Sequence, residues 1–550
     1  MKTKFLSRNH PFWIGFTAGL VAGAIASGVM LVISVSFGGI ALPEAVGSEL
    51  TALMPLPLFD YLHRTIGAGA KHIFFYGILV GQCLVFALSG AMYNLRINAQ
   101  GGRLQSYHGL LLAFILWLFA GGVLLPLTGA GFFGADLQVG LGAGMLSLAV
   151  VGLVFGLLFV YIERWLVTRV PDEAVSDRGS RDDLQDVKTS GKLSRRTVLK
   201  RGAVLAGIGV VGVGLWRFIT AGIATSKVPV AQLLQHYRSK IVPPPTPNYG
   251  EFQPVPFLSP EITSNDQYYV VSKNLFADPT VDGATWSLRV DGQVDSPFTF
   301  TYQELQALPM KQQYESMMCV SNEVGGPLMS NALWEGIPLA DLLQRAGVKA
   351  GATKVVFHAA DDYTDSIHLT KALESTTLLA VRMNGVKLPQ EHGFPARMLV
   401  PGIYGMKHCK WVTRIEVVNY DYQGYWQQRG WSDPAPIRMT ARIDTPLDGS
   451  NAPVNRSTSL AGVAFSGNKG ISEVDVSTDA GQSWQRATLK QPFSGLTWVL
   501  WELAWKPTST GSYSIIVRAI DLEGNVQDPN EAPPLPNGSS GYHSITVNVA

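Results

Sequence analysis

Long apolar runs fill the first 225 residues of this 550-residue chain, and shorter alternating runs fill the rest. A helix needs about 20 apolar residues to cross a bilayer core of about 30 Å. Four early stretches meet that requirement: 12–37, 72–93, 108–130 and 138–162. A fifth stretch, 202–223, is weaker because it is rich in glycine and contains Arg217. The pattern predicts a bundle of five transmembrane helices ahead of a soluble region.

Basic residues gather on one side of the predicted helices. They precede the first helix, separate the second from the third, and separate the fourth from the fifth: Lys2, Lys4, Arg8, Arg96, Arg103 and the run from Arg164 to Arg201. The loops near 38–71 and 131–137 contain fewer basic residues. Cytoplasmic loops carry the excess of Lys and Arg. We therefore expect a cytoplasmic N-terminus and, after five crossings of the lipid bilayer, an extracytoplasmic location for residues 226–550.

A charged linker without apolar periodicity, 171–193, precedes the fifth predicted helix. Residues 194–200 then read Ser-Arg-Arg-Thr-Val-Leu-Lys. Adjacent arginines alone are common beside membranes, but this sequence ahead of a weakly apolar segment resembles a twin-arginine export signal. That pathway exports folded proteins, often with a cofactor already inserted. We expect the fifth helix to remain as an anchor, with cleavage near Ala224 as the alternative.

Short strands and helices are predicted beyond residue 226. The proline-rich segment 227–265 indicates an extended stalk. Strands are predicted at 286–292, 354–358 and 398–400, with short helices at 302–308 and at 339–346, where Gly347 follows as a cap. Further alternating segments lie at 458–465, 474–478, 498–505 and 512–520. Separated by turns such as 479–481, they predict an immunoglobulin-like sandwich.

Composition excludes several kinds of site. The formal net charge is +2, and the three cysteines, Cys83, Cys319 and Cys409, form no CxxC motif. This spacing argues against a zinc ribbon, an iron–sulfur cluster, a c-type haem and a disulfide-stapled fold. The soluble part has no basic patch interleaved with aromatic residues, so we expect no nucleic acid partner.

A b-type haem requires two histidines at matching depth on different helices. His63 and His72 lie near the outer side of the predicted bundle, whereas His108 lies near the inner side. We therefore expect no haem, and we expect the many glycine and alanine residues to support close helix packing.

Two stretches of the soluble part carry candidate chemistry. Cys319 follows an extended run, in a polar turn that ends in two glycines. A thiolate there is a soft metal ligand, although a lone cysteine is more often a small buried hydrophobe. The second stretch, 388–411, gathers cationic side chains on glycine-punctuated loops: His392, Arg397, Lys407, His408 and Lys410. Such loops suit an anionic ligand.

These motifs together resemble the sulfite oxidase family of molybdopterin enzymes. The similarity is carried in order by Cys-Val-Ser-Asn at 319–322, Trp-Glu-Gly-Ile-Pro-Leu at 334–339 and the block 392–411. It extends from about residue 260 to the C-terminus, and segment 424–431 most resembles a bacterial membrane-bound branch. The resemblance implies a molybdenum–molybdopterin cofactor with Cys319 as the metal ligand. The residues it implies around the pterin and its phosphate are Asn274, Asp361, His392, Arg397 and the backbone of His408, Cys409 and Lys410.

The sequence therefore predicts four regions. They are a transmembrane region (1–168), a linker with export motif and fifth helix (169–225), an α+β molybdopterin-binding oxidoreductase domain (226–438) and an immunoglobulin-like domain of the family's dimerisation type (439–550). The resemblance of the last region to the family's dimerisation domain is compatible with a dimer.

The sequence departs from the family at the substrate. Members that oxidise sulfite carry arginines just after the molybdenum cysteine, where this chain has Glu323 and Val324. Trp431 stands in the place of the active-site tyrosine, and the family's arginine-bearing segment before the site contains Lys273 here. A small oxyanion needs positive charge, so sulfite is not the favoured substrate, and the residues of catalysis stay unassigned.

The leading hypothesis is a molybdenum-cofactor oxidoreductase, anchored in a bacterial cell membrane with its catalytic domain outside the cytoplasm. It would transfer oxygen atoms between a small-molecule substrate and water at a cysteine-ligated metal. A reductase of sulfur or nitrogen oxides is the alternative within this class. A cofactor-free exported binding module on the same scaffold is the alternative from another class. Because no haem, flavin or iron–sulfur motif occurs, electrons would pass to a separate cytochrome or quinone-linked protein.

Overall fold

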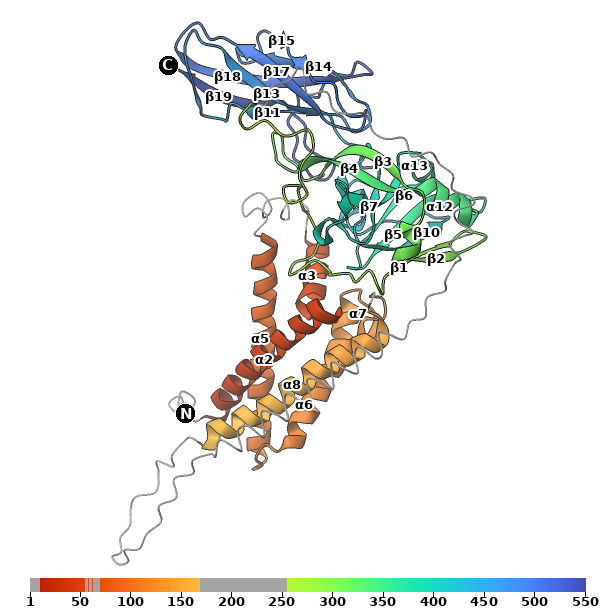
Figure 1. Ribbon diagram of the computed structural model, residues 1–550. Coiled ribbons are helices and arrows are strands. Elements are labelled where there is room, and N and C mark those ends of the chain that lie inside the picture. The colour runs from red at the N-terminus through yellow and green to blue at the C-terminus, as the bar shows by residue number, and fades with distance from the viewer. Residues whose placement is uncertain (1–9, 55–57, 59–61, 63–69, 138, 169–254) are drawn as a thin grey trace, which may run out of the picture. The chain divides into compact units, whose positions relative to one another are not determined.

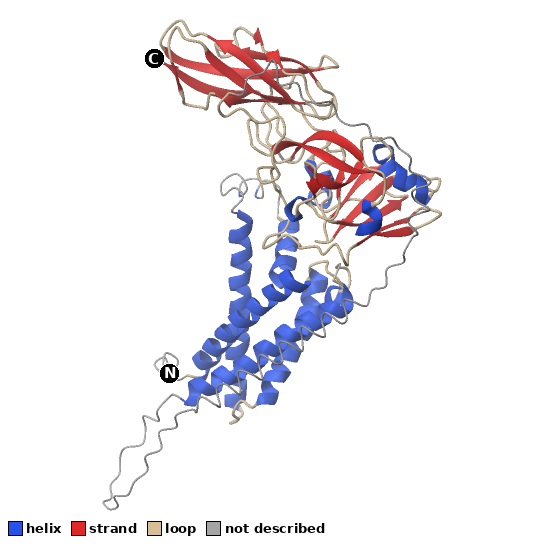
Figure 2. Ribbon diagram, viewed as in Figure 1, coloured by secondary structure: helices blue, strands red, loops and turns tan. Residues whose placement is uncertain are grey.

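The computed structural model describes residues 10–54, 58, 62, 70–137, 139–168 and 255–550. The predicted linker, the twin-arginine motif, the fifth helix and most of the predicted stalk lie outside these residues. The described chain forms two compact units. One contains the early helices together with the short segment 274–277, and the other contains 255–273 and 278–550. Figure 2 shows the contrast between a helical first unit and a second unit built mainly of strands.

The helical unit confirms the four long apolar stretches as helices. Its elements are α2 (Pro11–Phe37), α3 (Leu42–Leu53), α5 (Ala70–Ala99), α6 (Ser106–Phe119), η2 (Ala120–Leu124), α7 (Leu125–Leu127), η3 (Phe132–Gly134) and α8 (Gly140–Thr168). Four helical segments within it are long and apolar enough to cross a membrane: Pro11–Phe37, Lys71–Ala99, Ser106–Leu127 and Gly140–Thr168. A Cβ atom on Gly15 would lie 2.6 Å from the carbonyl oxygen of Gly90. Helices α2 and α5 therefore pack at a distance that only small residues allow.

Polar groups in this unit serve helix ends and short connections. His108 Nδ1 accepts a hydrogen bond of 2.9 Å from the backbone N–H of Gln105, which caps the start of α6. The carboxylate of Glu44 on α3 accepts hydrogen bonds from the backbone N–H groups of Leu275 (2.8 Å) and Phe276 (3.2 Å). The segment 274–277 is thereby held within the helical unit.

The second unit begins with two sheets and three short helices (Figure 1). The first sheet has the order β2-β1-β10-β5-β6: β2 (Phe298–Thr301), β1 (Ser287–Gly292), β10 (Val412–Val418), β5 (Lys354–Ala359) and β6 (Thr364–His368). The second has the order β3-β4-β7-β8, with β9 also paired to β7: β3 (Lys311–Met318), β4 (Met329–Pro338), β7 (Leu378–Met383), β8 (Val386–Lys387) and β9 (Arg397–Leu399). The helices are α11 (Tyr302–Gln306), α12 (Leu339–Ala346) and α13 (Leu369–Ala372). The predicted strands and short helices of this region are confirmed, with shifts of one or two residues at their ends.

Helix α12 shows how the local sequence produces these elements. Leu339, Leu342, Leu343 and Ala346 recur at helical spacing and are all fully buried, so one apolar stripe faces the core. Gly347 follows at φ 69°, and its backbone N–H closes the last turn. An L-residue rarely adopts this left-handed conformation, which explains glycine at this cap.

Two further sheets complete the chain. One has the order β11-β13-β17-β16: β11 (Thr440–Thr445), β13 (Thr458–Phe465), β17 (Val499–Trp505) and β16 (Thr488–Leu489). The other has the order β12-β19-β18-β14-β15: β12 (Asn451–Ala452), β19 (His543–Val549), β18 (Gly511–Asp521), β14 (Ile471–Ser477) and β15 (Gln485–Arg486). Side chains from both sheets share one hydrophobic cluster that surrounds the buried Trp501. The four predicted strand segments of this region are confirmed.

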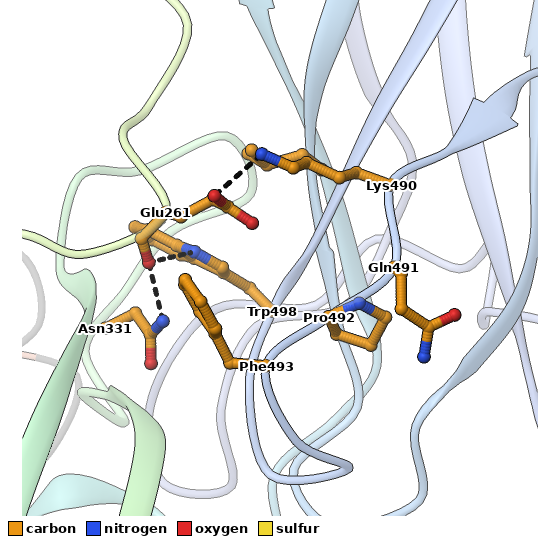
Figure 3. A pocket seen from close by; sticks show the side chains of 8 residues that line it. Glu261, Asn331, Lys490, Gln491, Pro492, Phe493 and Trp498 are labelled. Carbon is orange, nitrogen blue, oxygen red and sulfur yellow. Dashed lines mark hydrogen bonds and ion pairs between the residues drawn. The ribbon is translucent and has the colours of Figure 1, made fainter. Parts of the chain in front are cut away.

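Segment 255–265 joins the two pairs of sheets at Glu261. Its carboxylate forms an ion pair of 2.7 Å with Lys490, and its carbonyl accepts hydrogen bonds from Asn331 (2.6 Å) and from Trp498 (3.3 Å) (Figure 3). The cavity beside these residues has a volume of about 10 Å³, which is roughly the space of one water molecule. We therefore interpret this place as a structural junction and not as a substrate site.

Candidate metal and anion site

Cys319 directly follows β3, in a turn held by its own backbone. Its N–H donates to the carbonyl of Leu328 (3.0 Å), and Asn322 closes the turn by accepting from the N–H of Leu328 through its side chain (2.8 Å). The side chain of Cys319 is 7% exposed, and its Sγ lies 3.0 Å from the hydroxyl oxygen of Ser321. Burial raises the pKa of this thiol. A bound metal ion would offset that cost, because coordination deprotonates a thiol.

Arg397 on β9 is a buried cation held by backbone carbonyls. It donates to the carbonyl of His392 (3.0 Å) and to that of His408 (3.4 Å), and its guanidinium lies 5.3 Å from the ring centroid of Trp334. No carboxylate in the described part of the chain forms an ion pair with it, and its Nε has no hydrogen-bond partner there. A buried charge without a partner is costly. The planar fork of this arginine suits a phosphate.

Other buried polar atoms close to Cys319 and Arg397 also lack protein partners. In the described residues they include the hydroxyls of Tyr268 and Tyr269 and Oε1 of Glu315. Burial raises the pKa of both tyrosines and raises that of Glu315 to about 8. Buried polar groups are nearly always hydrogen-bonded in folded proteins. Several such groups beside one thiol and one unpaired arginine fit a polar, anionic cofactor.

Both histidines of the block are neutral in this geometry. His408 Nδ1 accepts from the N–H of Val400 (3.4 Å), while its Nε2–H donates to the carbonyl of Ile403 (3.2 Å). Burial, followed by the nearby Arg397 charge, lowers the pKa of His408 to about 3. His392 Nε2 lies 2.6 Å from the carbonyl of Asn265, and burial lowers its pKa as well. The positive charge of this pair of loops therefore comes from its arginine and lysine side chains and not from the histidines.

The remaining predicted site residues lie in different segments of the fold. Asn274 is buried, but it belongs to the segment that groups with the helical unit. Asp361 lies in the turn between β5 and β6 and accepts from the N–H of Tyr363 (3.2 Å). The buried thiol of Cys409 has a raised pKa, first through burial and next through the charge of Asp361. Lys410 donates to the carbonyl of Glu391 (3.0 Å).

Two residues of the cationic block have partners within the protein. The backbone N–H of His408 donates to the carbonyl of Gly405 (3.1 Å). Lys407 is fully buried, and its ammonium lies 2.8 Å from Asp365 Oδ1 and 2.9 Å from Asp433 Oδ1. Two carboxylates neutralise this lysine, so it contributes no charge to an anion site.

Sequence reasoning missed Tyr268, Tyr269 and Glu315. Glu315 carried no clear signal in the sequence, because it stands among the polar residues of strand 311–318 and only the structure shows that it is 1% exposed. A carboxylate at such a position is rarely tolerated unless it is paired or neutral. The adjacent tyrosines carried no signal either, since aromatic residues are common in the core.

Comparisons with known proteins agree with this geometry. Residues 276–426 match the oxidoreductase molybdopterin binding domain, and residues 437–537 match the Mo-co oxidoreductase dimerisation domain. Mitochondrial sulfite oxidase of Rattus norvegicus is 30% identical over 351 residues, covering 54% of this chain and 64% of that protein, which is less than two thirds of its length.

Two further comparisons were found. The uncharacterized oxidoreductase YuiH of Bacillus subtilis (strain 168) is 33% identical over 150 residues, covering 27% of this chain and 74% of that protein. The sulfane dehydrogenase SoxCD of Paracoccus pantotrophus aligns with a TM-score of 0.46 and 21% identity, over 59% of this chain and 93% of that one. On the two matched domains and the aligned relatives, the chain belongs to the sulfite oxidase family of molybdopterin-dependent oxidoreductases.

Proposed function

We propose that the protein is a membrane-anchored, extracytoplasmic oxidoreductase that uses a molybdenum–molybdopterin cofactor bound through Cys319. The observation that carries the proposal is that a buried thiol, Cys319, and a buried cation without an ion-paired carboxylate among the described residues, Arg397, both lie near Tyr269. A cofactor with a soft metal and an anionic tail matches both groups. Molybdenum held there would supply two-electron chemistry with oxygen-atom transfer.

The chain's own residues would bind and orient that cofactor. Arg397 would hold the phosphate, and the carbonyls of His392 and His408 fix the plane of its guanidinium. The hydroxyls of Tyr268 and Tyr269 would donate to polar edges of the pterin, which would satisfy two buried groups without protein partners in the described chain. We keep Asn274, Asp361, Cys409 and Lys410 as further proposed contacts from the family resemblance.

Molybdenum and pterin analysis of the purified full-length protein tests this proposal. We expect stoichiometric molybdenum in the parent and a strong loss in Cys319→Ser. The matched control is Cys83→Ser, which alters a free thiol on α5 of the helical unit and no proposed cofactor contact. Molybdenum at full occupancy in Cys319→Ser would refute the ligand assignment. A parent protein without molybdenum would favour the cofactor-free binding module.

Membrane anchoring is supported by the four helical segments that are long and apolar enough to span a bilayer. The extracytoplasmic side, the fifth helix and export by a twin-arginine signal remain part of the proposal, because they depend on residues outside the described ones. Replacing Arg195 and Arg196 by lysine tests them. We expect the soluble region to stay protease-protected inside spheroplasts, and full export of this variant would contradict the signal.

We propose domain boundaries of 226–438 and 439–550, and the two matched regions, 276–426 and 437–537, overlap these domains. We propose that the second of these domains is immunoglobulin-like and contributes to a dimer, as the description of its matched region suggests. Electrons would pass to a separate cytochrome or quinone-linked protein. Sedimentation analysis in detergent, compared with a chain ending before β11, distinguishes a dimer from a monomer.

A further inference from the structure

Ser321 stands two residues after Cys319, and its hydroxyl oxygen lies 3.0 Å from the thiol sulfur. The two side chains meet because residues 319–322 form a tight turn, which the backbone N–H of Asn322 closes on the carbonyl of Cys319 (3.1 Å). In the described part of the chain, the hydroxyl of Ser321 has no hydrogen-bond partner other than this sulfur. The hydroxyl proton is therefore not committed to another acceptor.

Deprotonation of the thiol fixes the direction of this hydrogen bond. A thiol and a hydroxyl can each donate or accept, so either atom can be the donor while the thiol keeps its proton. A thiolate bound to a metal ion has no proton and can only accept. The hydroxyl of Ser321 then has to donate to the sulfur. Burial raises the pKa of the Cys319 thiol, and the hydrogen bond with Ser321 opposes that rise.

Side chains from the C-terminal region hold this turn in place. Arg442 on β11 donates from Nη1 to the carbonyl of Gly326 (2.8 Å), and the hydroxyl of Ser539 donates to the carbonyl of Asn322 (2.7 Å). Contacts of this kind, one step away from a metal, orient the residue that binds it. The contact between hydroxyl and sulfur therefore lies in a fixed turn.

Gly325 lets the same turn pack against His543. It adopts φ +74°, and a Cβ atom there would clash with the His543 ring. Only glycine combines this backbone conformation with the close approach. The ring is fixed in turn, because its Nδ1 accepts a hydrogen bond from the backbone N–H of Ile443 (3.0 Å). The turn thus has little freedom to move the hydroxyl away from the sulfur.

We propose that Ser321 is a positioning residue that donates a hydrogen bond to the metal-bound sulfur of Cys319 and raises the reduction potential of the metal. The inference rests on the proposed function and deepens it. A hydrogen bond to a ligating sulfur withdraws electron density from it, which stabilises the reduced, more electron-rich metal. The higher potential favours transfer of electrons from the substrate to the metal.

Potentiometric titration of the full-length, detergent-solubilised holoenzyme tests this role, with electron paramagnetic resonance of the molybdenum as the signal. We expect a lower midpoint potential in Ser321→Ala than in the parent. Ser321→Thr keeps the hydroxyl and should have the potential of the parent. Ser321→Val has the shape of the threonine variant without its hydroxyl, so it should follow Ser321→Ala.

The thiolate-to-metal charge-transfer absorption provides a second readout. We expect it at longer wavelength in the two variants without a hydroxyl, because the sulfur holds its electrons less tightly when the hydrogen bond is lost. Ser539→Ala is the matched control, since it removes another hydroxyl contact to the same turn that does not involve the sulfur. It should have the potential and the absorption of the parent.

An unchanged potential in Ser321→Ala would overturn the inference, as would an equal decrease in Ser321→Ala and Ser539→Ala. If Ser321→Val does not fold, the comparison of Ser321→Ala with Ser321→Thr decides the question. Molybdenum content is measured on every sample. Full molybdenum with an unchanged potential in Ser321→Ala refutes the role of Ser321 alone, whereas a parent without molybdenum refutes the proposed function and this inference with it.

Discussion

Asp433 holds two buried lysines at once, and replacing it by asparagine tests how much this arrangement stabilises the fold. Its two carboxylate oxygens lie 2.9 Å from Lys407 Nζ and 2.7 Å from Lys354 Nζ. The lysine side chains are 0% and 2% exposed, respectively. Asp433→Asn removes the negative charge between them and leaves their other partners in place, including Asp365 beside Lys407 (2.8 Å).

The expected cost follows from the partners that remain. Breaking a fully buried ion pair costs about 3–5 kcal/mol, but Lys407 keeps Asp365 and Lys354 keeps the carbonyl of Tyr422 (3.0 Å). Asp433 is also 22% exposed. We therefore expect a loss of about 2–4 kcal/mol, which corresponds to a melting temperature lower by roughly 5–12 °C for a domain of this size.

Asp421→Asn is the matched control. Asp421 contacts the same ammonium of Lys354, yet its side chain is 72% exposed, so its loss should cost less than about 1 kcal/mol. Thermal unfolding followed by tryptophan fluorescence, at low and at high salt, compares the two variants. The Asp421 effect should fade with salt, and the Asp433 effect should persist. Equal shifts for the two variants would refute the argument that burial decides the strength of these contacts.

Two further predictions concern the junctions of the second unit. Lys490→Met leaves the carboxylate of Glu261 mostly buried without its partner, so we expect a loss of about 2–3 kcal/mol in thermal unfolding, and Glu261→Gln in the same chain should restore part of it. His543 Nδ1 accepts from the N–H of Ile443 (3.0 Å), and burial, followed by the Arg442 charge, lowers its pKa below 6.5. The unfolded protein therefore binds more protons at this residue. The contribution of His543 to stability is complete above pH 6.5 and is lost as the pH falls through its pKa in the folded protein. Denaturant unfolding between pH 7.5 and 5 should show a weaker dependence of the unfolding free energy on pH for His543→Asn than for the parent. An unchanged dependence would contradict this assignment.

Periodicity predicted those elements whose cause is local. The four long helices, α12 with Gly347, and the paired strands of both regions follow from runs of apolar residues and from turn residues nearby in the chain. The local structure of the site could be predicted for the same reason, because β9 and its flanking loops bring Arg397 and His408 together within eleven residues. Such contacts depend little on the rest of the structure.

Contacts between distant segments could not be predicted from this one sequence. Lys407 stands in the same block as Arg397, but it is neutralised by Asp365 and Asp433, which lie 42 and 26 residues away along the chain. Periodicity does not reveal such pairings. Cationic side chains in one block were therefore assigned one role, although the tertiary structure gives them different partners.

Pairing with a carboxylate separates the buried cations that stabilise this fold from those whose charge is available to a ligand. Lys407 and Lys354 are buried in ion pairs with carboxylates, so their charge is neutralised within the protein. Arg397 forms no ion pair with a carboxylate in the described chain, and backbone carbonyls hold its guanidinium instead. Its planar fork therefore keeps its charge for a bound phosphate. This difference in partners is our reason for assigning the cofactor's phosphate to Arg397 and not to Lys407.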